Sequence, residues 1–161
     1  WYDIEGYALD KYVAEQGEFL TNKIKNMIVE NPDIINKQKK DIIYVISPFK
    51  NVAYQLSKEL NKIEFTRYDK KGKPTNIGTV HTFQGKEAPI VFFVLGADKK
   101  CIGAANWAVG TDNPNIMNVA VTRAKEEFYI IGDKEMYLSL NSDVINDTCK
   151  IIEKHNMNTS L

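Results

Sequence analysis

Few of the residue types that mark specialised protein classes occur in this chain. Its 161 residues include two cysteines, Cys101 and Cys149. They are too few and too far apart for a zinc cluster or a disulfide framework, so we expect two reduced thiols and no metal site. The longest apolar run, residues 90–95, is far shorter than the roughly 20 residues of a membrane helix, and no charged-then-apolar leader opens the chain. These absences predict a cytoplasmic protein with no membrane partner.

The chain also lacks net charge, because 21 basic residues meet 21 acidic ones and the sequence pI is about 6.9. Proteins that coat phosphates by bulk attraction are usually basic. Any binding of nucleic acid must therefore depend on a local patch or on a partner domain. Arginine is scarce as well: Arg67 and Arg123 are the two arginines, so this residue is not used here for general solubility.

A phosphate-binding loop of the form Gly-x-x-x-x-Gly-Lys-Ser/Thr is missing. The nearest approach, Gly72-Lys73, is followed by Pro74, and Arg67 occupies the place of the first glycine. No Asp-Glu pair of a metal-holding strand is found either. The chain therefore lacks the parts that usually cradle phosphates and magnesium. Because it begins at Trp1 without an initiator methionine, we expect it to be excised from something longer.

With 43% hydrophobic and 26% charged residues, the chain suits a single compact domain over residues 1–161. Hydrophobic periodicity and turn residues divide it into helices and strands in alternation. We expect helices over about 15–29, 51–60, 113–125 and 142–154 and after Asp133, strands at 41–47, 76–82, 89–95 and 128–132, an exposed turn at 70–74, and a frayed tail from about residue 155.

Strands that alternate with helices predict an α/β fold with a mainly parallel central sheet covered on both faces. Ligands of such sheets bind beyond the carboxyl ends of the strands. Three segments expected there carry unusual polar residues, namely residues 47–50, 83–87 and 97–113.

The segment 83–87 has the chemistry of a nucleotide contact. Gly85 allows a sharp turn or a close approach to a ligand, and Gln84 offers both a donor and an acceptor. Glu87 offers two acceptor oxygens that suit the paired hydroxyls of a ribose. The alternative is a surface turn with a solvated lysine-glutamate pair.

Arg123 falls at the border of the apolar face of the helix expected to reach Lys125. A guanidinium held there could present its planar fork to a phosphate across a cleft. The alternative is an arginine that lies along the surface and makes a salt bridge at the rim.

Three segments taken together resemble conserved motifs of superfamily 1 helicases. Residues 78–87, Gly-Thr-Val-His-Thr-Phe-Gln-Gly-Lys-Glu, are similar to motif V, and residues 118–125, Asn-Val-Ala-Val-Thr-Arg-Ala-Lys, are similar to motif VI. Residues 47–49, Ser-Pro-Phe, resemble motif IV. The match is to the branch containing RNA-surveillance and Okazaki-processing helicases, and it covers nearly the whole chain.

The resemblance implies a RecA-like three-layer domain, the carboxy-terminal half of an ATP-dependent motor. ATP with magnesium would be bound jointly with an N-terminal RecA-like domain of the same polypeptide, which is absent here, so this chain alone would be inactive. Single-stranded DNA or RNA would be the partner. The residues implied are Glu87 on the ribose, Arg123 as the arginine finger, Gln84 and Gly85 in the nucleotide-facing loop, and Ser47, Pro48, Thr79 and His81 near the nucleic-acid backbone.

Two departures from the motifs are visible. Val52 stands where motif IV commonly has glutamine, and residues 115–117 replace an arginine-bearing approach to motif VI. Two other functions therefore stay open. One is a binding module with the same fold and no catalysis. The other is a self-sufficient α/β nucleotide-binding enzyme in which His81 would act as general base.

Overall fold

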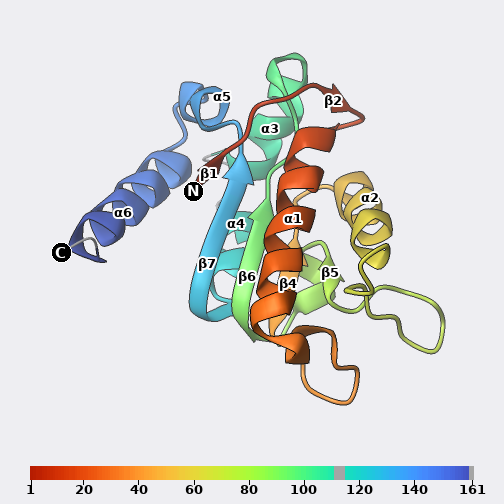
Figure 1. Ribbon diagram of the computed structural model, residues 1–161. Coiled ribbons are helices and arrows are strands. Elements are labelled where there is room, and N and C mark those ends of the chain that lie inside the picture. Colours follow the sequence, from red (N-terminus) through yellow and green to blue (C-terminus); the bar gives the residue numbers. More distant parts are fainter. Residues whose placement is uncertain (111–114, 160–161) are drawn as a thin grey trace.

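Five parallel strands form the central sheet of the computed structural model, in the spatial order β1-β7-β6-β4-β5 (Figure 1). The structure describes residues 1–110 and 115–159. The strands of this sheet are β1 Tyr2–Asp3, β4 Ile43–Ile46, β5 Ile77–Gly78, β6 Ala88–Val94 and β7 Ala124–Gly132. A small antiparallel hairpin pairs β2, Ala8–Leu9, with β3, Tyr12–Val13.

Helices cover the sheet on both sides (Figure 1). Helices α1 and α2 pack on one face, and α4 contacts β6 and β7 from the other face with α3 beside it. The helices are α1 Ala14–Glu30, α2 Lys50–Asn61, α3 Ile102–Val109, α4 Asn115–Val121, α5 Lys134–Ser139 and α6 Asp143–Thr159, and short 3₁₀ helices occur at Pro32–Ile35, Val80–Phe83 and Lys99–Cys101. The predicted RecA-like α/β architecture is confirmed.

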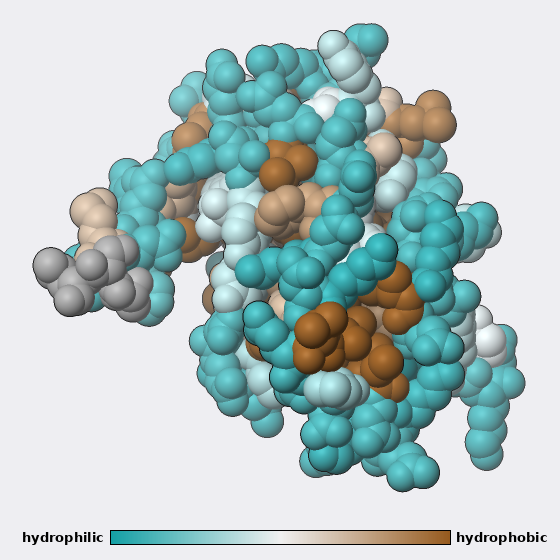
Figure 2. Space-filling model, in the orientation of Figure 1, coloured by the Kyte–Doolittle hydropathy of each residue, from teal (hydrophilic) through white to brown (hydrophobic). Residues whose placement is uncertain are grey.

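The two central strands are apolar on both faces because helices cover both. All four residues of β4 are buried, as are Val91–Val94 of β6. Away from this core the surface is mostly hydrophilic, and Figure 2 shows a hydrophobic patch beside the lower half of α1 and smaller ones above it. Helix α6 extends away from the sheet and contacts α5 (Figure 1).

Three predicted boundaries in the sheet region are wrong, and strand pairing explains them. The strand expected at 128–132 begins at Ala124, because β7 pairs with β6 from that residue. The strand expected over 76–82 ends at Gly78, because Gly78 pairs with Ile46, the last residue of β4, and no strand continues beyond it. The chain then turns into the 3₁₀ helix Val80–Phe83. The helix expected to reach Lys125 ends at Val121, because Ala124 enters β7 opposite Ala88 of β6.

Helices α1 and α2, strands β4 and β6, the helix after Asp133 and the turn near Gly72 lie where they were expected. The tail expected to fray from residue 155 is helical as far as Thr159. The hairpin β2–β3, strand β1 and helix α3 were not predicted. The expected cap at residues 113–114 lies outside the described residues.

Candidate functional site

Six of the eight predicted site residues line one cleft of about 850 Å³. They come from three segments: Pro48 follows β4, Arg123 follows α4, and the others lie between β5 and β6. We call this hollow the Arg123 cleft. The six residues are Pro48, Thr79, His81, Gln84, Gly85 and Arg123, and the other lining residues are Lys11, Phe49, Lys50, Asn51, Val80, Trp107, Asn115, Ile116 and Val119.

None of the described residues that line the cleft is an aspartate or a glutamate. Lys50 and Arg123 bring positive charge, whereas the ammonium of Lys11 is paired with Asp10 at 2.7 Å. Amide and hydroxyl groups supply uncharged hydrogen-bonding partners. Basic side chains line the hollow at the amino edge of the sheet as well, but there Asp41 and Glu87 accompany them. The Arg123 cleft therefore suits a ligand with several negative charges.

Arg123 lies in the turn between α4 and β7, and its guanidinium reaches across to the loop before β6. Nη1 donates to the carbonyl oxygens of Phe83 and Lys86 at 3.2 and 3.3 Å. Nε donates to the Val119 carbonyl at 3.3 Å, and Nη2 to the Thr122 hydroxyl at 3.2 Å. A guanidinium has five N–H groups, so one N–H on Nη2 stays available to a ligand beside this network. The half-buried side chain is thus held against the segment that carries Gln84 and Gly85.

The segment held by Arg123 turns tightly at Gly85. Its φ of +72° is a left-handed conformation that glycine adopts without strain. The amide of Lys86 donates to the Phe83 carbonyl at 2.9 Å, which closes the turn. A Cβ placed at Gly85 would meet nothing within 4 Å, so the space beside it is open.

Ser47 lies outside the cleft, because it is fully buried at the end of β4. Its hydroxyl accepts from the amide of Phe49 at 3.3 Å, and its own amide donates to the Gly78 carbonyl at 3.0 Å. Ser47 therefore shapes the turn that presents Pro48 and Phe49.

Glu87 also lies outside the cleft, at the amino end of β6, whereas Pro48 and Thr79 follow the carboxyl ends of β4 and β5. The expectation that residues 83–87 lie beyond a carboxyl end holds for the start of this segment and is wrong for Glu87. The chain crosses from one edge of the sheet to the other between Gly78 and Ala88. Glu87 lies 3.5 Å from Lys125 of β7, and both side chains are exposed.

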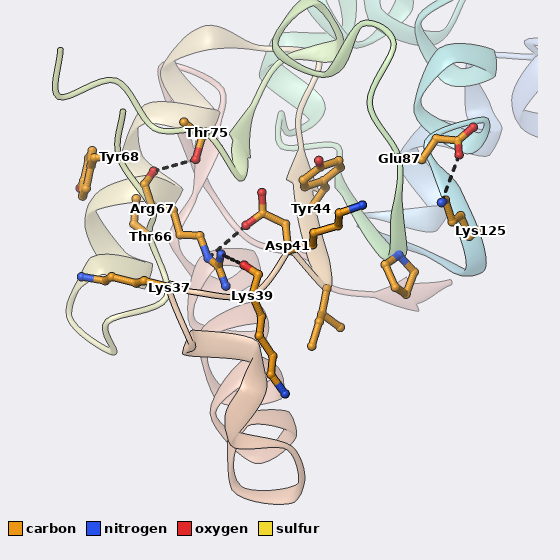
Figure 3. A pocket seen from close by; sticks show the side chains of 13 residues that line it. Lys37, Lys39, Asp41, Tyr44, Thr66, Arg67, Tyr68, Thr75, Glu87 and Lys125 are labelled. Carbon is orange, nitrogen blue, oxygen red and sulfur yellow. Dashed lines mark hydrogen bonds and ion pairs between the residues drawn. The ribbon is translucent and has the colours of Figure 1, made fainter. Parts of the chain in front are cut away.

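Glu87 and Lys125 line a second hollow of about 710 Å³ at this amino edge (Figure 3). Its other side is formed by Arg67, which donates to the carbonyls of Lys39, Asn36 and Ile34 at 2.7, 2.9 and 3.3 Å. Figure 3 shows Glu87 turned toward Lys125 and Arg67 turned toward Asp41 and the Lys39 carbonyl. Arg67 is thus committed to holding its own loop.

Oδ1 of Asp41 lies 3.0 Å from Nε of Arg67, so the two side chains form an ion pair. The same Oδ1 atom makes no hydrogen bond of good geometry to the described residues. Burial raises the pKa of the Asp41 carboxyl above its ordinary value, although the charges of Arg67 and Lys86 act in the opposite direction. This carboxylate is therefore held at a cost in desolvation.

Sequence reasoning missed several residues of the Arg123 cleft, above all Trp107 and Lys11. Trp107 belongs to α3, which was not predicted, and Lys11 lies in the turn of the hairpin β2–β3. Trp107 lies in the segment 97–113, which was expected beyond the carboxyl end of a strand, but within that segment its type, one of two tryptophans in the chain, was the signal available. No sequence pattern brings Lys11 near Phe49 and Trp107.

Within residues 1–110 and 115–159, no group of three or more histidine, cysteine, aspartate and glutamate side chains is placed to hold a metal ion. In the same part of the chain, every helix is too short or too polar to cross a membrane.

Comparison with known proteins gives two matches. Residues 10–135 match the family model described as "AAA domain". Over 131 residues the chain is 30% identical to Helicase sen1 of Schizosaccharomyces pombe, an alignment that covers 80% of this chain and 7% of that protein. The chain thus corresponds to a small part of the curated relative that it matches.

Proposed function

The chain belongs to the AAA domain family, and from this membership we propose that it is the C-terminal motor domain of an ATP-dependent superfamily 1 helicase. The similarity to Helicase sen1 supports the helicase assignment. In this proposal an N-terminal RecA-like domain of the same polypeptide supplies the other wall of the ATP site. The observation that carries the proposal is the Arg123 cleft, which gathers Arg123, Gln84 and Gly85 with Pro48, Thr79 and His81.

Arg123 is proposed as the arginine finger. Phosphoryl transfer spreads negative charge over the equatorial oxygens of the transferred group, and a positioned guanidinium stabilises that charge. The bonds from Arg123 to Phe83 and Lys86 support this role, because they hold the guanidinium at the edge of the open space beside Gly85. One N–H is left to meet a phosphate oxygen.

ATP with magnesium fits the residues present in part. We assign the part of the cleft beside Arg123 and Gly85 to the γ-phosphate and the part beside Pro48 and Thr79 to the single strand. Glu87 is proposed as the ribose contact in the adjoining hollow. Magnesium would neutralise phosphate oxygens when bound. We assign its ligands to the N-terminal domain.

Pro48, Thr79 and His81 are proposed to contact the backbone of single-stranded DNA or RNA. Hydroxyl and amide groups bind phosphates without reading sequence, which suits a motor that moves along any strand. Ser47 contributes through the turn that it shapes, since its hydroxyl already accepts from Phe49.

The test uses the parent protein that carries both motor domains. We predict that Arg123→Ala lowers nucleic-acid-stimulated ATP turnover by at least about 10²-fold, because removing a transition-state charge contact has effects of this size. Phosphate release is measured at saturating ATP and oligonucleotide, and circular dichroism confirms that the variant is folded.

Arg67→Ala is the matched control. Arg67 and Arg123 both donate to loop carbonyls, so both substitutions remove comparable bracing. Only Arg123 lines the cleft, and Arg67→Ala should therefore leave turnover per folded molecule within about 3-fold of wild type, well below the 10²-fold loss expected at an arginine finger. Equal losses in the two variants would reduce Arg123 to a structural brace. Undiminished turnover in Arg123→Ala, with strand binding intact, would favour the non-catalytic binding module.

A further inference from the structure

Trp107 is a large aromatic side chain on helix α3, where Ile102, Gly103 and Asn106 are also exposed. Helix α3 buries Ala105, Ala108 and Val109, whereas the Trp107 side chain is 54% exposed and lines the Arg123 cleft. Leaving an indole in contact with water forgoes the stabilisation that its burial would give. The fold therefore holds an apolar aromatic surface open to this hollow.

Trp107 packs against the ring of Phe49. The Phe49 ring is buried, and its centroid lies 6.2 Å from that of Trp107 at an interplanar angle of 31°. This separation is within the range of favourable aromatic pairs. The backbone amide of Phe49 donates to the Ser47 hydroxyl, which helps to hold the ring that Trp107 packs against.

Positive charge and apolar surface meet at this place. Lys50 adjoins Phe49 in sequence, and Lys11, which is paired with Asp10, lines the same hollow. No described lining residue is itself an aspartate or a glutamate. A stacking surface next to basic groups is the combination that proteins use to bind single strands, where bases stack on aromatic rings and lysines track the phosphates. The basic side chains favour a polyanion, and the exposed indole favours a ligand with flat apolar groups.

We infer that Trp107, seated on Phe49, is a stacking platform for a base of the single strand bound in the Arg123 cleft. The inference deepens the proposed function, because it adds a base contact to a surface otherwise proposed to hold only the backbone. Stacking is tolerant of sequence, since every base has a π-face. The platform would therefore hold the strand without selecting its sequence.

The first experiment follows the fluorescence of Trp107 in the 161-residue chain. The substitution Trp1→Phe leaves Trp107 as the sole tryptophan. We expect 20-nucleotide oligo(dT) and oligo(U) to quench its emission, and an abasic oligomer of equal length to leave it unchanged, because only bases can stack on the ring. Absence of quenching by the base-bearing strands would overturn the inference. Quenching by ATP that these strands cannot compete away would do so too, because it would assign the platform to a mononucleotide.

The second experiment measures strand affinity in the parent protein by fluorescence anisotropy. Trp107→Ala should raise the Kd for oligo(dT) by roughly 5- to 150-fold, the effect of losing one stacked base, and Trp107→Phe should restore most of it. The Kd for the abasic oligomer should be the same in all variants. Tyr54→Ala is the matched control, because Tyr54 is 55% exposed on α2 and does not line the cleft.

The two proposals fail in different ways. An unchanged oligo(dT) Kd in Trp107→Ala would overturn the platform and leave the motor assignment intact if Arg123→Ala still abolishes turnover. A parent protein whose turnover is indifferent to Arg123→Ala would overturn the motor assignment. The quenching and affinity measurements would then still decide whether Trp107 stacks on a base.

Discussion

The two arginines of this chain make similar local contacts in different surroundings. Arg67 donates to three carbonyls and pairs with Asp41, and Arg123 donates to three carbonyls and a hydroxyl. Arginine suits such bracing because its planar fork offers five fixed donors. The two residues line different hollows: Arg67 lines the one with Asp41 and Glu87, and Arg123 lines the cleft with Gln84 and Gly85.

Asp41 gives a pH prediction at this scale. Burial raises its pKa in the folded protein above the ordinary value of 3.8, so the folded state binds a proton more readily than the unfolded chain. The wild type should therefore lose stability relative to Asp41→Asn as pH rises from 3.8 through the higher pKa of the folded state. Urea unfolding of both proteins between pH 3.5 and 7 measures this difference.

The loss of stability of the wild type relative to Asp41→Asn should be smallest at the acid end, where the carboxyl is largely protonated in both the folded and the unfolded state. A wild type that instead gains stability relative to Asp41→Asn over this interval would show that the pairing with Arg67 outweighs desolvation. Asp69→Asn serves as the reference substitution, because Asp69 lies in an exposed turn.

At the scale of elements, the hairpin β2–β3 places Lys11 in the wall of the cleft. Its turn holds Asp10 and Lys11 at φ values of 45° and 69°, which non-glycine residues adopt at some cost. Several bonds secure it: Ala97 donates to the Lys11 carbonyl at 2.7 Å, and Asn51 to the Asp10 carbonyl at 3.0 Å. The strain is thus offset by contacts with the loop after β6 and with α2.

Asp98 anchors the same hairpin and provides a prediction. Its carboxylate accepts from the amides of Ala8 and Lys100, each at 2.9 Å. We expect Asp98→Ala to lower the free energy of unfolding by about 1–3 kcal/mol, because a charged acceptor is lost from a buried position and the Ala8 amide is left unpaired. Urea denaturation measures the loss, and faster hydrogen exchange at Ala8 would locate it in the hairpin.

Asp69→Ala is the matched control, since Asp69 also accepts from two amides, those of Lys71 and Lys73, in an exposed turn away from the hairpin. Asp69→Ala should lower the free energy of unfolding by less than Asp98→Ala and leave hydrogen exchange at Ala8 unchanged.

The hydrogen bond from Ala8 lowers the pKa of Asp98. The stability that Asp98 contributes is therefore present above pH 3.8 and is lost as pH falls through the lower pKa of the folded state. Protection of Ala8 that is indifferent to Asp98→Ala would contradict this anchoring.

At the scale of the whole molecule, the sheet separates the predicted site residues into two groups. Pro48 and Thr79 follow carboxyl ends of strands, and Glu87 precedes an amino end. The crossover between β5 and β6 connects the two edges, and Arg123 is bonded to its last part. A ligand that contacts both Arg123 and Glu87 would therefore extend over the edge of the sheet, where a second domain could enclose it.

This arrangement predicts that the 161-residue chain does not turn over ATP alone. The chain has no phosphate-binding loop, and the Arg123 cleft offers no described carboxylate for a magnesium ion. Phosphate release should stay at the buffer rate with and without oligonucleotide, whereas the parent protein should be active. Turnover by the chain itself, abolished by His81→Ala, would instead favour a self-sufficient nucleotide-binding enzyme.

The sequence by itself determined the class of fold. Runs such as Ile43–Ile46 and Ala88–Val94 are apolar enough to be buried on both faces, and helical periodicity marks α1 and α2. These signals are local, so they can be read without the structure. It also identified Gln84, Gly85 and Arg123 as candidates, because their chemistry and order are visible in the chain.

The tertiary structure decided where elements end and which side chains meet. Pairing with β6 ends the helix before Arg123, since backbone hydrogen bonds in the sheet outweigh a continued helical period. Distant segments bring Lys11, Phe49 and Trp107 to one cleft, while Ser47 is buried and Glu87 lies in the adjoining hollow at the amino ends of β6 and β7. The sequence placed the segments 47–50 and 97–113 beyond carboxyl ends of strands, but which of their side chains meet depends on the packing of the whole sheet.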